Sequence, residues 1–433
     1  MHSKMRFTAV GDILVQRRLP GAYDGFNEIY DFINKGDLRF FNLETTLHKG
    51  ECFASQFSGG SWFRANPEVL DDMRMFGFNI LSFANNHTMD FSYDGLLKTL
   101  DAVNQYGFPN AGVGRNLSEA AAPVYLDTLS GRVALISVVS TFNPTAMAGE
   151  QSRRVIGRPG VNGLRFEEKF YVMAEQMETI KKLAEDTCIN GYNNILRSEG
   201  YLPELPEGCF DFKNIRFIVG EQTKRVSNVN ESDMVRVEKA IYEAQLQADY
   251  IIVSVHSHEI QGTNKETPDD FLREFSHRCI DKGAHGVVGH GPHLLRPIEI
   301  YKQRPIFYSL GDFVLQSENI EFAPEDFYAS YGLNSDATMH DLFKKRSNHF
   351  TRGLQTKREM FESVIPYWEM EDGKLTKLEL HPVELGFGQP RSTSGWPRPA
   401  KDSSLSERII DMSEAYGTKM ILADGVIKVL VEQ

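Results

Sequence analysis

The sequence has few cysteines, no long hydrophobic run and no excess of basic residues. Its 433 residues include four scattered cysteines and no CxxC pair, which argues against a disulfide framework and against a zinc–cysteine site. No segment approaches the roughly 20 consecutive apolar residues that a membrane-spanning helix needs. The first residues contain no apolar stretch of signal-peptide length. We therefore expect a cytoplasmic protein without a membrane span, with a native leader missing from this chain as the alternative.

The charge balance narrows the range of partners. Lysine and arginine together number 47, aspartate and glutamate number 59, and the formal net charge is -12. A sequence-independent nucleic-acid binder needs a basic surface, so we expect no nucleic-acid partner. A polyanionic substrate remains compatible with this balance, provided that a local cationic site or a metal meets it.

Apolar runs typical of buried strands alternate with helical patterns, which indicates a layered α/β fold. Strands are expected at 6–12, 38–44, 78–87, 131–140, 248–256, 284–290, 304–313 and 425–431. Helices are expected at 24–35, 66–76, 92–106, 167–186, 231–247, 267–283 and 404–415. Asn66-Pro67-Glu68 and Thr267 are the expected helix starts, and Gly107 and Gly283 the expected ends.

The alternation also predicts the domain organisation. We expect one domain over 5–388, interrupted by insertions at about 142–245 and 317–355, and a C-terminal extension over 389–433. The first insertion is interpreted as an elaboration near the site rather than a separate domain. Residues 361–385 are typical of two strands around an Asp-Gly turn.

Polar side chains follow the expected strands at their carboxyl ends, where open α/β sheets bind their ligands. They are Asp12, Glu44, Asn85-Asn86-His87, His256-Ser257-His258, and His290 with His293. Each alone has a structural explanation as a helix cap, a turn former or a core histidine with its hydrogen bonds satisfied. Because these residue types bind Zn, Mn and Fe, their recurrence at successive strand ends predicts a metal or catalytic site.

Several short motifs carry a family resemblance. They are Gly11-Asp12, Asn42-Leu43-Glu44, Ala84-Asn85-Asn86-His87-xx-Asp90, Gly289-His290-x-Pro292-His293, Pro297-x-Glu299-x-Tyr301 and Tyr308-Ser309-Leu310-Gly311-Asp312-Phe313. In this order they resemble the CapA family, which is named for poly-γ-glutamate capsule synthesis and belongs with the calcineurin-like metallophosphoesterases. The resemblance implies a four-layer α/β/β/α sandwich of the metallophosphoesterase type, with divalent metal held between the two sheets.

The resemblance also implies roles for the polar residues. Asp12 would bind one metal, Glu44 would bridge, and Asn86 and His256 would bind a second metal. His290 and His293 would complete the site. His87 would lie near the leaving group as an acid or an orienting residue. One or two ions are implied, among Mn, Zn, Fe and Mg, which would supply a metal-activated water.

This chain departs from the metallophosphoesterase pattern in ways that bear on these roles. The first strand continues Asp12-Ile13-Leu14, without the usual second ligand histidine, and Glu44 replaces the usual bridging aspartate. His258 is interpreted as a compensating ligand. Asp312 stands where the family motif has asparagine, which adds an acid or a group that orients a ligand.

Two functions are compatible with the sequence. The first is a metal-dependent hydrolase that cleaves a phosphate ester or a γ-glutamyl amide, in a small molecule or a γ-glutamyl polymer. The alternative is a non-catalytic accessory protein of poly-γ-glutamate (capsule) biosynthesis that binds the polymer or a synthase. A homo-oligomer is left open. Arg153, Arg154, Arg158 and Arg165 form either a cationic rim for anionic groups or, as the favoured interpretation, an ordinary surface stretch.

Overall fold

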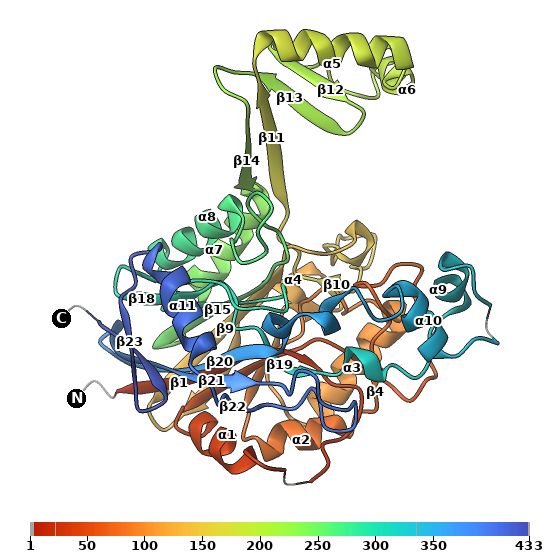
Figure 1. Ribbon diagram of the computed structural model, residues 1–433. Coiled ribbons are helices and arrows are strands. Elements are labelled where there is room, and N and C mark those ends of the chain that lie inside the picture. The colour runs from red at the N-terminus through yellow and green to blue at the C-terminus, as the bar shows by residue number, and fades with distance from the viewer. Residues whose placement is uncertain (1–3, 22, 335, 432–433) are drawn as a thin grey trace.

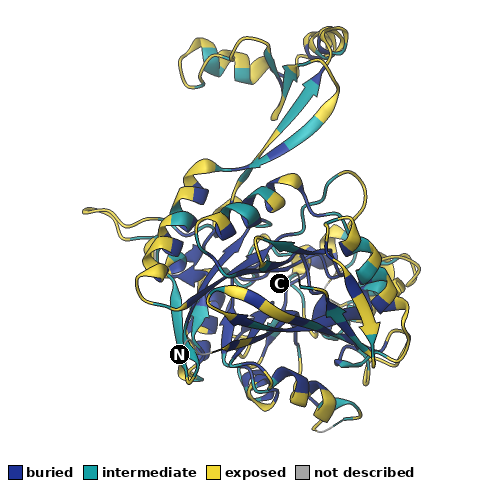
Figure 2. Cartoon of the chain, turned by 90° about the vertical axis from the view of Figure 1, so that its left-hand side faces the viewer, coloured by how far each residue is buried: buried dark blue, intermediate teal, exposed yellow. Residues whose placement is uncertain are grey.

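The structure is a computed structural model that describes residues 4–21, 23–334 and 336–431. Two β-sheets pack face to face in the body of the molecule, and a slender arm projects from it (Figure 1). Both sheets are rich in buried residues, which Figure 2 shows in dark blue. The site lies where strands of both sheets end, so the arrangement of the sheets is what positions it.

Ten of the described strands form the first sheet, in the order β23-β24-β21-β20-β1-β2-β5-β6, with β19 beside β1 and β22 beside β21. Their bounds are β1 Met5–Leu14, β2 Leu38–Leu43, β5 Ile80–Ser82, β6 Asn110–Ala111, β19 Asp312–Leu315, β20 Glu362–Glu371, β21 Lys374–Glu384, β22 Arg398–Pro399, β23 Met420–Ala423 and β24 Val426–Val429. β1 is central and parallel to β2 and β19. Because both of its faces are covered, it is buried along almost its whole length, with Arg6 as the one exposed residue of the strand.

Six of the described strands form the second sheet, in the order β17-β18-β16-β15-β9-β8. Their bounds are β8 Val124–Thr128, β9 Gly131–Val139, β15 Tyr250–His256, β16 Gly286–His290, β17 Ile298–Tyr301 and β18 Arg304–Phe307. β15 is fully buried and runs parallel to β9 and β16. Phe7 and Phe40 of the first sheet pack with Ile252 and Val288 of the second in one apolar core.

Helices cover the outer face of each sheet, which confirms the expected four-layer α/β/β/α sandwich. The first sheet is covered by α1 Phe26–Ile33, α2 Val69–Met75 and α3 Ser92–Gln105. The second is covered by α7 Glu231–Gln245 and α8 Asp270–Asp281. Leu405 and Ile409 of α11 (Ser404–Glu414) pack into the core between the sheets. Each helix turns its apolar side toward a sheet, as amphipathic helices do.

The arm is the part of the fold that the sequence patterns misassigned. The range 167–186 was expected to be one helix, but it begins as a strand, and 187–230 holds further regular structure. The arm consists of β11 Phe166–Val172, α5 Ala174–Thr187, α6 Gly191–Ser198, β12 Cys209–Phe212, β13 Ile215–Val219 and β14 Lys224–Val229. Residues 166–171 of β11 pair with β14, far away in the sequence, and this non-local pairing overrides the local helical pattern.

The expected position of the insertion also needs correction. Figure 1 shows the arm standing away from the body, with α5 and α6 at its tip. Only the beginning of the insertion lies beside the site, where Phe142, Asn143 and Thr145 line a small cavity together with His258. The division into domain, insertions and extension stays a prediction.

The remaining elements are short and surround the body. They are β3 Thr46–Leu47, β4 Arg64–Ala65, β7 Val113–Gly114, α4 Leu117–Ala121, η1 Pro144–Ala146, β10 Gly160–Val161, η2 Ser317–Asn319, α9 Glu325–Ser330, α10 Met339–Arg346, η3 Leu354–Thr356 and η4 Arg358–Phe361. Two expected helix starts were wrong by up to three residues. α2 begins at Val69 with Glu68 before it, and α8 follows Asp269 rather than Thr267. Gly107 follows α3 with a φ of 68°, as expected of a glycine after a helix.

Candidate metal centre

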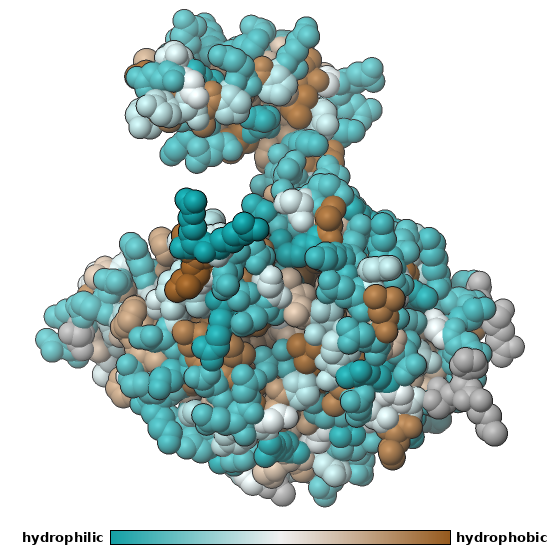
Figure 3. All heavy atoms as spheres, turned by 180° about the vertical axis from the view of Figure 1, so that it is seen from behind, coloured by the Kyte–Doolittle hydropathy of each residue, from teal (hydrophilic) through white to brown (hydrophobic). Residues whose placement is uncertain are grey.

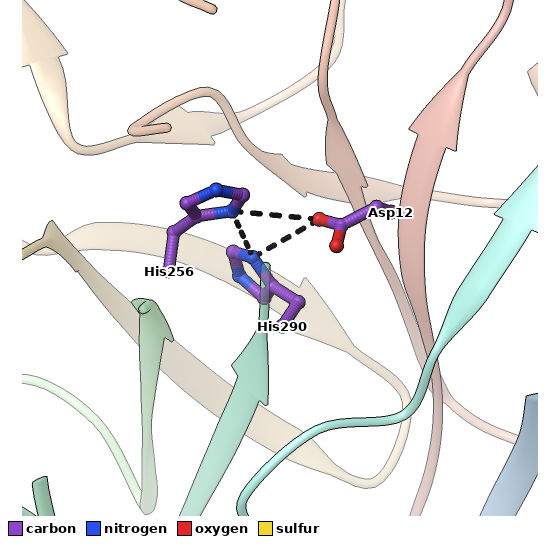
Figure 4. Close-up of side chains that lie close together, drawn as sticks. All are labelled: Asp12, His256 and His290. Carbon is purple, nitrogen blue, oxygen red and sulfur yellow. Dashed lines mark hydrogen bonds and ion pairs between the residues drawn. The ribbon is translucent and has the colours of Figure 1, made fainter. Parts of the chain in front are cut away.

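Strand register brings the first three polar side chains together. His256 ends β15 and His290 ends β16, and the two residues are paired in the parallel ladder. Asp12 lies near the end of β1, on the facing sheet. Figure 4 shows the aspartate and both imidazoles pointing toward one another. Their convergence follows from the fold, because parallel strands end at the same edge of a sheet.

Asp12 is fully buried and held on both sides. Its Oδ1 accepts a hydrogen bond from Asn42 Nδ2 at 2.7 Å, and its Oδ2 accepts one from the Gly291 backbone N–H at 2.7 Å. Oδ1 also lies 3.3 Å from His290 Nδ1 and 3.5 Å from His256 Nδ1. Burial would raise the pKa of Asp12, but the contacts with both histidines outweigh it and hold the pKa well below its usual range.

The Nδ1 atoms of His256 and His290 both face Asp12 Oδ1, so the two imidazoles could bind the same metal ion. His256 Nδ1 and His290 Nδ1 lie 2.9 Å apart, and Ser254 Oγ contacts His290 Nε2 at 2.8 Å. On its other side, His256 Nε2 lies 3.1 Å from His258 Nε2. Burial lowers the pKa of His256 to about 4 and that of His258 well below its usual range, so both are neutral at pH 7. Neutral imidazole is the form that binds a metal.

Glu44 is the least satisfied residue of the group. It follows β2, has no exposed surface, and neither carboxylate oxygen has a hydrogen-bond partner. Burial, followed by the charges of Asp12 and Asp312, raises the pKa of Glu44 well above its usual range. Three imidazoles surround its Oε1: His256 at 3.7 Å, His87 at 3.8 Å and His293 at 4.0 Å. A buried carboxylate without partners is costly unless a cation compensates it.

Asp312 and His293 form a pair beside Glu44. Asp312 begins β19 and is paired with Asp12 in the parallel ladder. Its Oδ1 lies 2.9 Å from His293 Nδ1, while its Oδ2 is buried without a partner. Burial raises the pKa of Asp312 to about 6. Burial would lower the pKa of His293, but the charge of Asp312 outweighs burial and raises that pKa.

The loop after β5 supplies the opposite wall. Asn86 Nδ2 donates to the Gly59 carbonyl at 3.0 Å, which leaves Asn86 Oδ1 buried without a partner. His87 Nδ1 contacts Asp90 Oδ2 at 2.7 Å, and so its Nε2 faces Glu44. Asp90 also accepts the backbone N–H groups of Gly59 and Phe63, at 2.9 and 2.8 Å. Asp90 therefore fixes both the His87 ring and the loop that covers it.

The donor atoms form three overlapping groups, in which all donors lie within 4.8 Å of one another. The groups are Asp12 with His256 and His290; Glu44 with His256 and His258; and Asp12 with Glu44, His293 and Asp312. Together with the unpartnered oxygens of Glu44, Asp312 and Asn86, this mixed nitrogen and oxygen set fits a divalent ion. The sharing of Asp12, Glu44 and His256 between groups gives room for one or two ions.

The structure thus brings eight of the residues that the sequence singled out close together, namely Asp12, Glu44, His87, His256, His258, His290, His293 and Asp312, and Asn86 lines a small cavity together with His258. Their individual roles stay predictions. The arginine rim is different: Arg165 forms an ion pair with Asp233 at 2.8 Å, and Arg158 donates to the Met147 carbonyl. Neither residue lines the cavities beside the centre, which agrees with the favoured interpretation of these arginines as an ordinary surface stretch.

Two further residues support the centre from behind. Arg296, which follows the histidine motif in the sequence, is fully buried and donates to the backbone carbonyls of Ser257, His258 and Glu259, which fixes the loop that carries His258. Sequence reasoning missed Ser254, although its position two residues before His256 places it on the same face of β15. That alternation is the signal that could have found it.

The family described as "Bacterial capsule synthesis protein PGA_cap" matches residues 6–317. The chain belongs to this family. The match confirms the resemblance that the motifs carried. An uncharacterized protein of Sinorhizobium fredii (strain NBRC 101917 / NGR234) is 31% identical to this PGA_cap protein, over 96% of this chain and 91% of the relative. The PGA biosynthesis protein CapA of Bacillus subtilis (strain 168) is 25% identical, over 85% and 80% of the two chains.

Other similar proteins are more distant. A probable polyglutamine synthesis accessory protein of Mycobacterium tuberculosis (strain CDC 1551 / Oshkosh) is 27% identical over 66% of this chain and 57% of its own. A solved structure titled as a putative 5'-nucleotidase from Staphylococcus aureus aligns with a TM-score of 0.39 and 9% identity. That alignment covers 94% of the PGA_cap chain, which spans 58% of the length of the solved chain. Among the described residues of the PGA_cap protein, no helix is long and apolar enough to cross a membrane.

Proposed function

We propose that this PGA_cap family protein is a metal-dependent hydrolase whose buried centre holds one or two divalent ions and cleaves a γ-glutamyl amide or a phosphate ester. The observation that supports it most is Glu44, a fully buried carboxylate with two unpartnered oxygens among three histidines. A bound cation would compensate this buried carboxylate, which otherwise lowers the stability of the folded protein.

Different residues of the centre would share the work. Asp12, Glu44, His293 and Asp312 would hold one ion, and Glu44, His256 and His258 a second, with Asn86 Oδ1 as a further ligand. His290 forms a third donor group with Asp12 and His256, and it would bind an ion together with these two residues. A bound divalent ion supplies Lewis-acid polarisation and lowers the pKa of a coordinated water. Mn, Zn and Fe suit this donor set better than Mg does, because it contains four imidazoles, whereas Mg prefers a site made of oxygen ligands.

His87 is the proposed proton donor to the leaving group. Its Nδ1 is engaged by Asp90 at 2.7 Å, so Nε2 is the atom that faces the centre. The ring is almost completely buried and packs against Phe63, with ring centroids 4.3 Å apart. A histidine held by a carboxylate on one nitrogen can carry a proton on the other and deliver it at a fixed position.

The names of the relatives favour a γ-glutamyl amide over a phosphate ester as the substrate bond. PGA biosynthesis and polyglutamine synthesis appear in the names of proteins 25% and 27% identical to this chain. The second candidate is the accessory protein, which the Mycobacterium tuberculosis relative's name supports. The arm supports it too, since Tyr192, Ile195 and Tyr201 are exposed near its tip.

Elemental analysis of the purified protein tests the proposal. We expect about one to two equivalents of Mn, Zn or Fe per chain, as two-ion hydrolase sites hold, and loss of this metal in Glu44→Gln. The matched control is Glu299→Gln, because Glu299 is also buried but bonds to Tyr308 and His277 away from the centre. The same samples would be assayed with a γ-glutamyl peptide and an aryl phosphate. If the wild-type protein holds no metal after reconstitution, the proposal of a hydrolase is overturned and the accessory protein becomes the favoured function.

A further inference from the structure

A large cavity opens directly beside the metal centre. It has a volume of about 900 Å³, and both His87 and His293 line it. Its far wall is formed by α10 and the turns that follow, between His340 and Phe361. This segment belongs to the second insertion, for which the sequence suggested no function.

The charges on this wall are strongly one-sided. The lysines and arginines that line the cavity are Lys265, Arg346, Arg352, Lys357 and Arg391. Glu318 is the one acidic residue among the described lining residues, and Arg391 Nε lies 3.3 Å from it. Arg352, Lys357 and Lys265 form no ion pair with any described residue. In a protein of net charge -12, this local excess of positive charge requires an explanation.

A second, smaller cavity also borders the centre. Its volume is about 220 Å³, and Asn86 and His258 line it. Gly59 lines both cavities, and a side chain there would clash with Asn86 and His87 at 2.7 Å. Among the described residues of its lining there is no lysine, arginine, aspartate or glutamate. The centre therefore contributes residues to both a large cationic cavity and a small neutral one.

We propose that the wall from 340 to 357 is an anion-recognition site that binds two or more carboxylate or phosphate groups on one side of the bond to be cleaved. Arg352 and Lys357 are its main determinants, because they line the cavity and have no charged partner of their own among the described residues. The small cavity accepts the uncharged or smaller part of the substrate. This assignment rests on the proposed function only in placing the scissile bond at the metal centre.

The test compares two charge reversals in the full-length protein. Arg352→Glu with Lys357→Glu changes the wall, and Lys344→Glu with Lys345→Glu changes two neighbouring lysines of α10 that do not line the cavity. Both double variants alter the net charge equally. Calorimetric titration would use γ-linked triglutamate as the carboxylate probe, its methyl ester as the neutral comparison, and fructose 1,6-bisphosphate as the phosphate probe.

We expect at least tenfold weaker binding of the favoured anion in the Arg352→Glu, Lys357→Glu variant, about wild-type binding in the control variant, and no binding of the ester. Whichever of the two anionic probes the wild-type protein binds more tightly identifies carboxylate or phosphate as the group that the wall recognises. Equal losses in both variants, or no anion binding in the wild type, would overturn the inference. Repeating the titration in Glu44→Gln separates the two proposals, because a failed metal centre leaves anion binding to the wall intact.

Discussion

Buried carboxylates occur both at the base of the arm and in the metal centre, but their surroundings differ. Asp233 has arginines on both sides, Arg165 at 2.8 Å and Arg236 at 2.7 Å. Asp211 within the arm contacts two arginines in the same way. In the centre, Glu44 is equally buried and has no hydrogen-bond partner. The carboxylates of the arm are neutralised by arginines, whereas Glu44 and Asp312 in the centre keep buried oxygens without a hydrogen-bond partner.

The largest effect is expected where the arm joins the body. Asp233→Ala leaves Arg165 and Arg236 without their partner and removes an acceptor for the Arg165 backbone N–H. We expect a loss of about 3 kcal/mol in the free energy of unfolding, because the buried Asp233 carboxylate accepts hydrogen bonds from both arginines and the mostly buried Arg236 loses its charged partner. Urea denaturation measures this, with exposed Asp186→Ala as the control expected to change stability by less than about 0.5 kcal/mol. Equal effects of the two variants would contradict the structural role of the pair.

A change of opposite sign is expected in the centre. Glu44→Met replaces the unpartnered carboxylate with an apolar side chain of similar size, so we expect the metal-free protein to gain about 2 kcal/mol in the free energy of unfolding. Added Mn or Zn should stabilise the wild type and leave the variant unchanged, because binding to the native state alone shifts stability. Thermal melts with and without a chelator would show both effects. Destabilisation of the metal-free variant would mean that Glu44 has a structural partner after all.

The centre could be predicted from the sequence because each strand ends in its own polar motif. Asp12, Glu44, His256 and His290 follow runs of apolar residues, and parallel pairing then brings these residues together. The arm could not be predicted, because pairing of Phe166–Val172 with residues 224–229 depends on contacts remote in sequence. The cationic wall was missed for the same reason. Nothing near Arg352 in the sequence shows that the folded chain places it in the same cavity as His87.

The smallest expected effect concerns a histidine that has neither a carboxylate nor a metal to bind. His381 stacks on Phe32 with ring centroids 4.6 Å apart, and both of its ring nitrogens are buried without partners. Burial, followed by the charge of Lys35, lowers the pKa of His381 to about 4, below its ordinary value of 6.5. The unfolded chain therefore binds the extra proton between these pH values, and this residue's contribution to stability rises with pH from about 4 to 6.5. His381→Phe should consequently stabilise the protein at pH 5 relative to pH 7.5, as measured by urea denaturation at both pH values in the presence of chelator. A pH-independent difference in stability between variant and wild type would show that His381 is protonated in the folded protein as readily as in the unfolded chain. Burial without a hydrogen-bond partner would then not be enough to lower the pKa of a histidine in this protein.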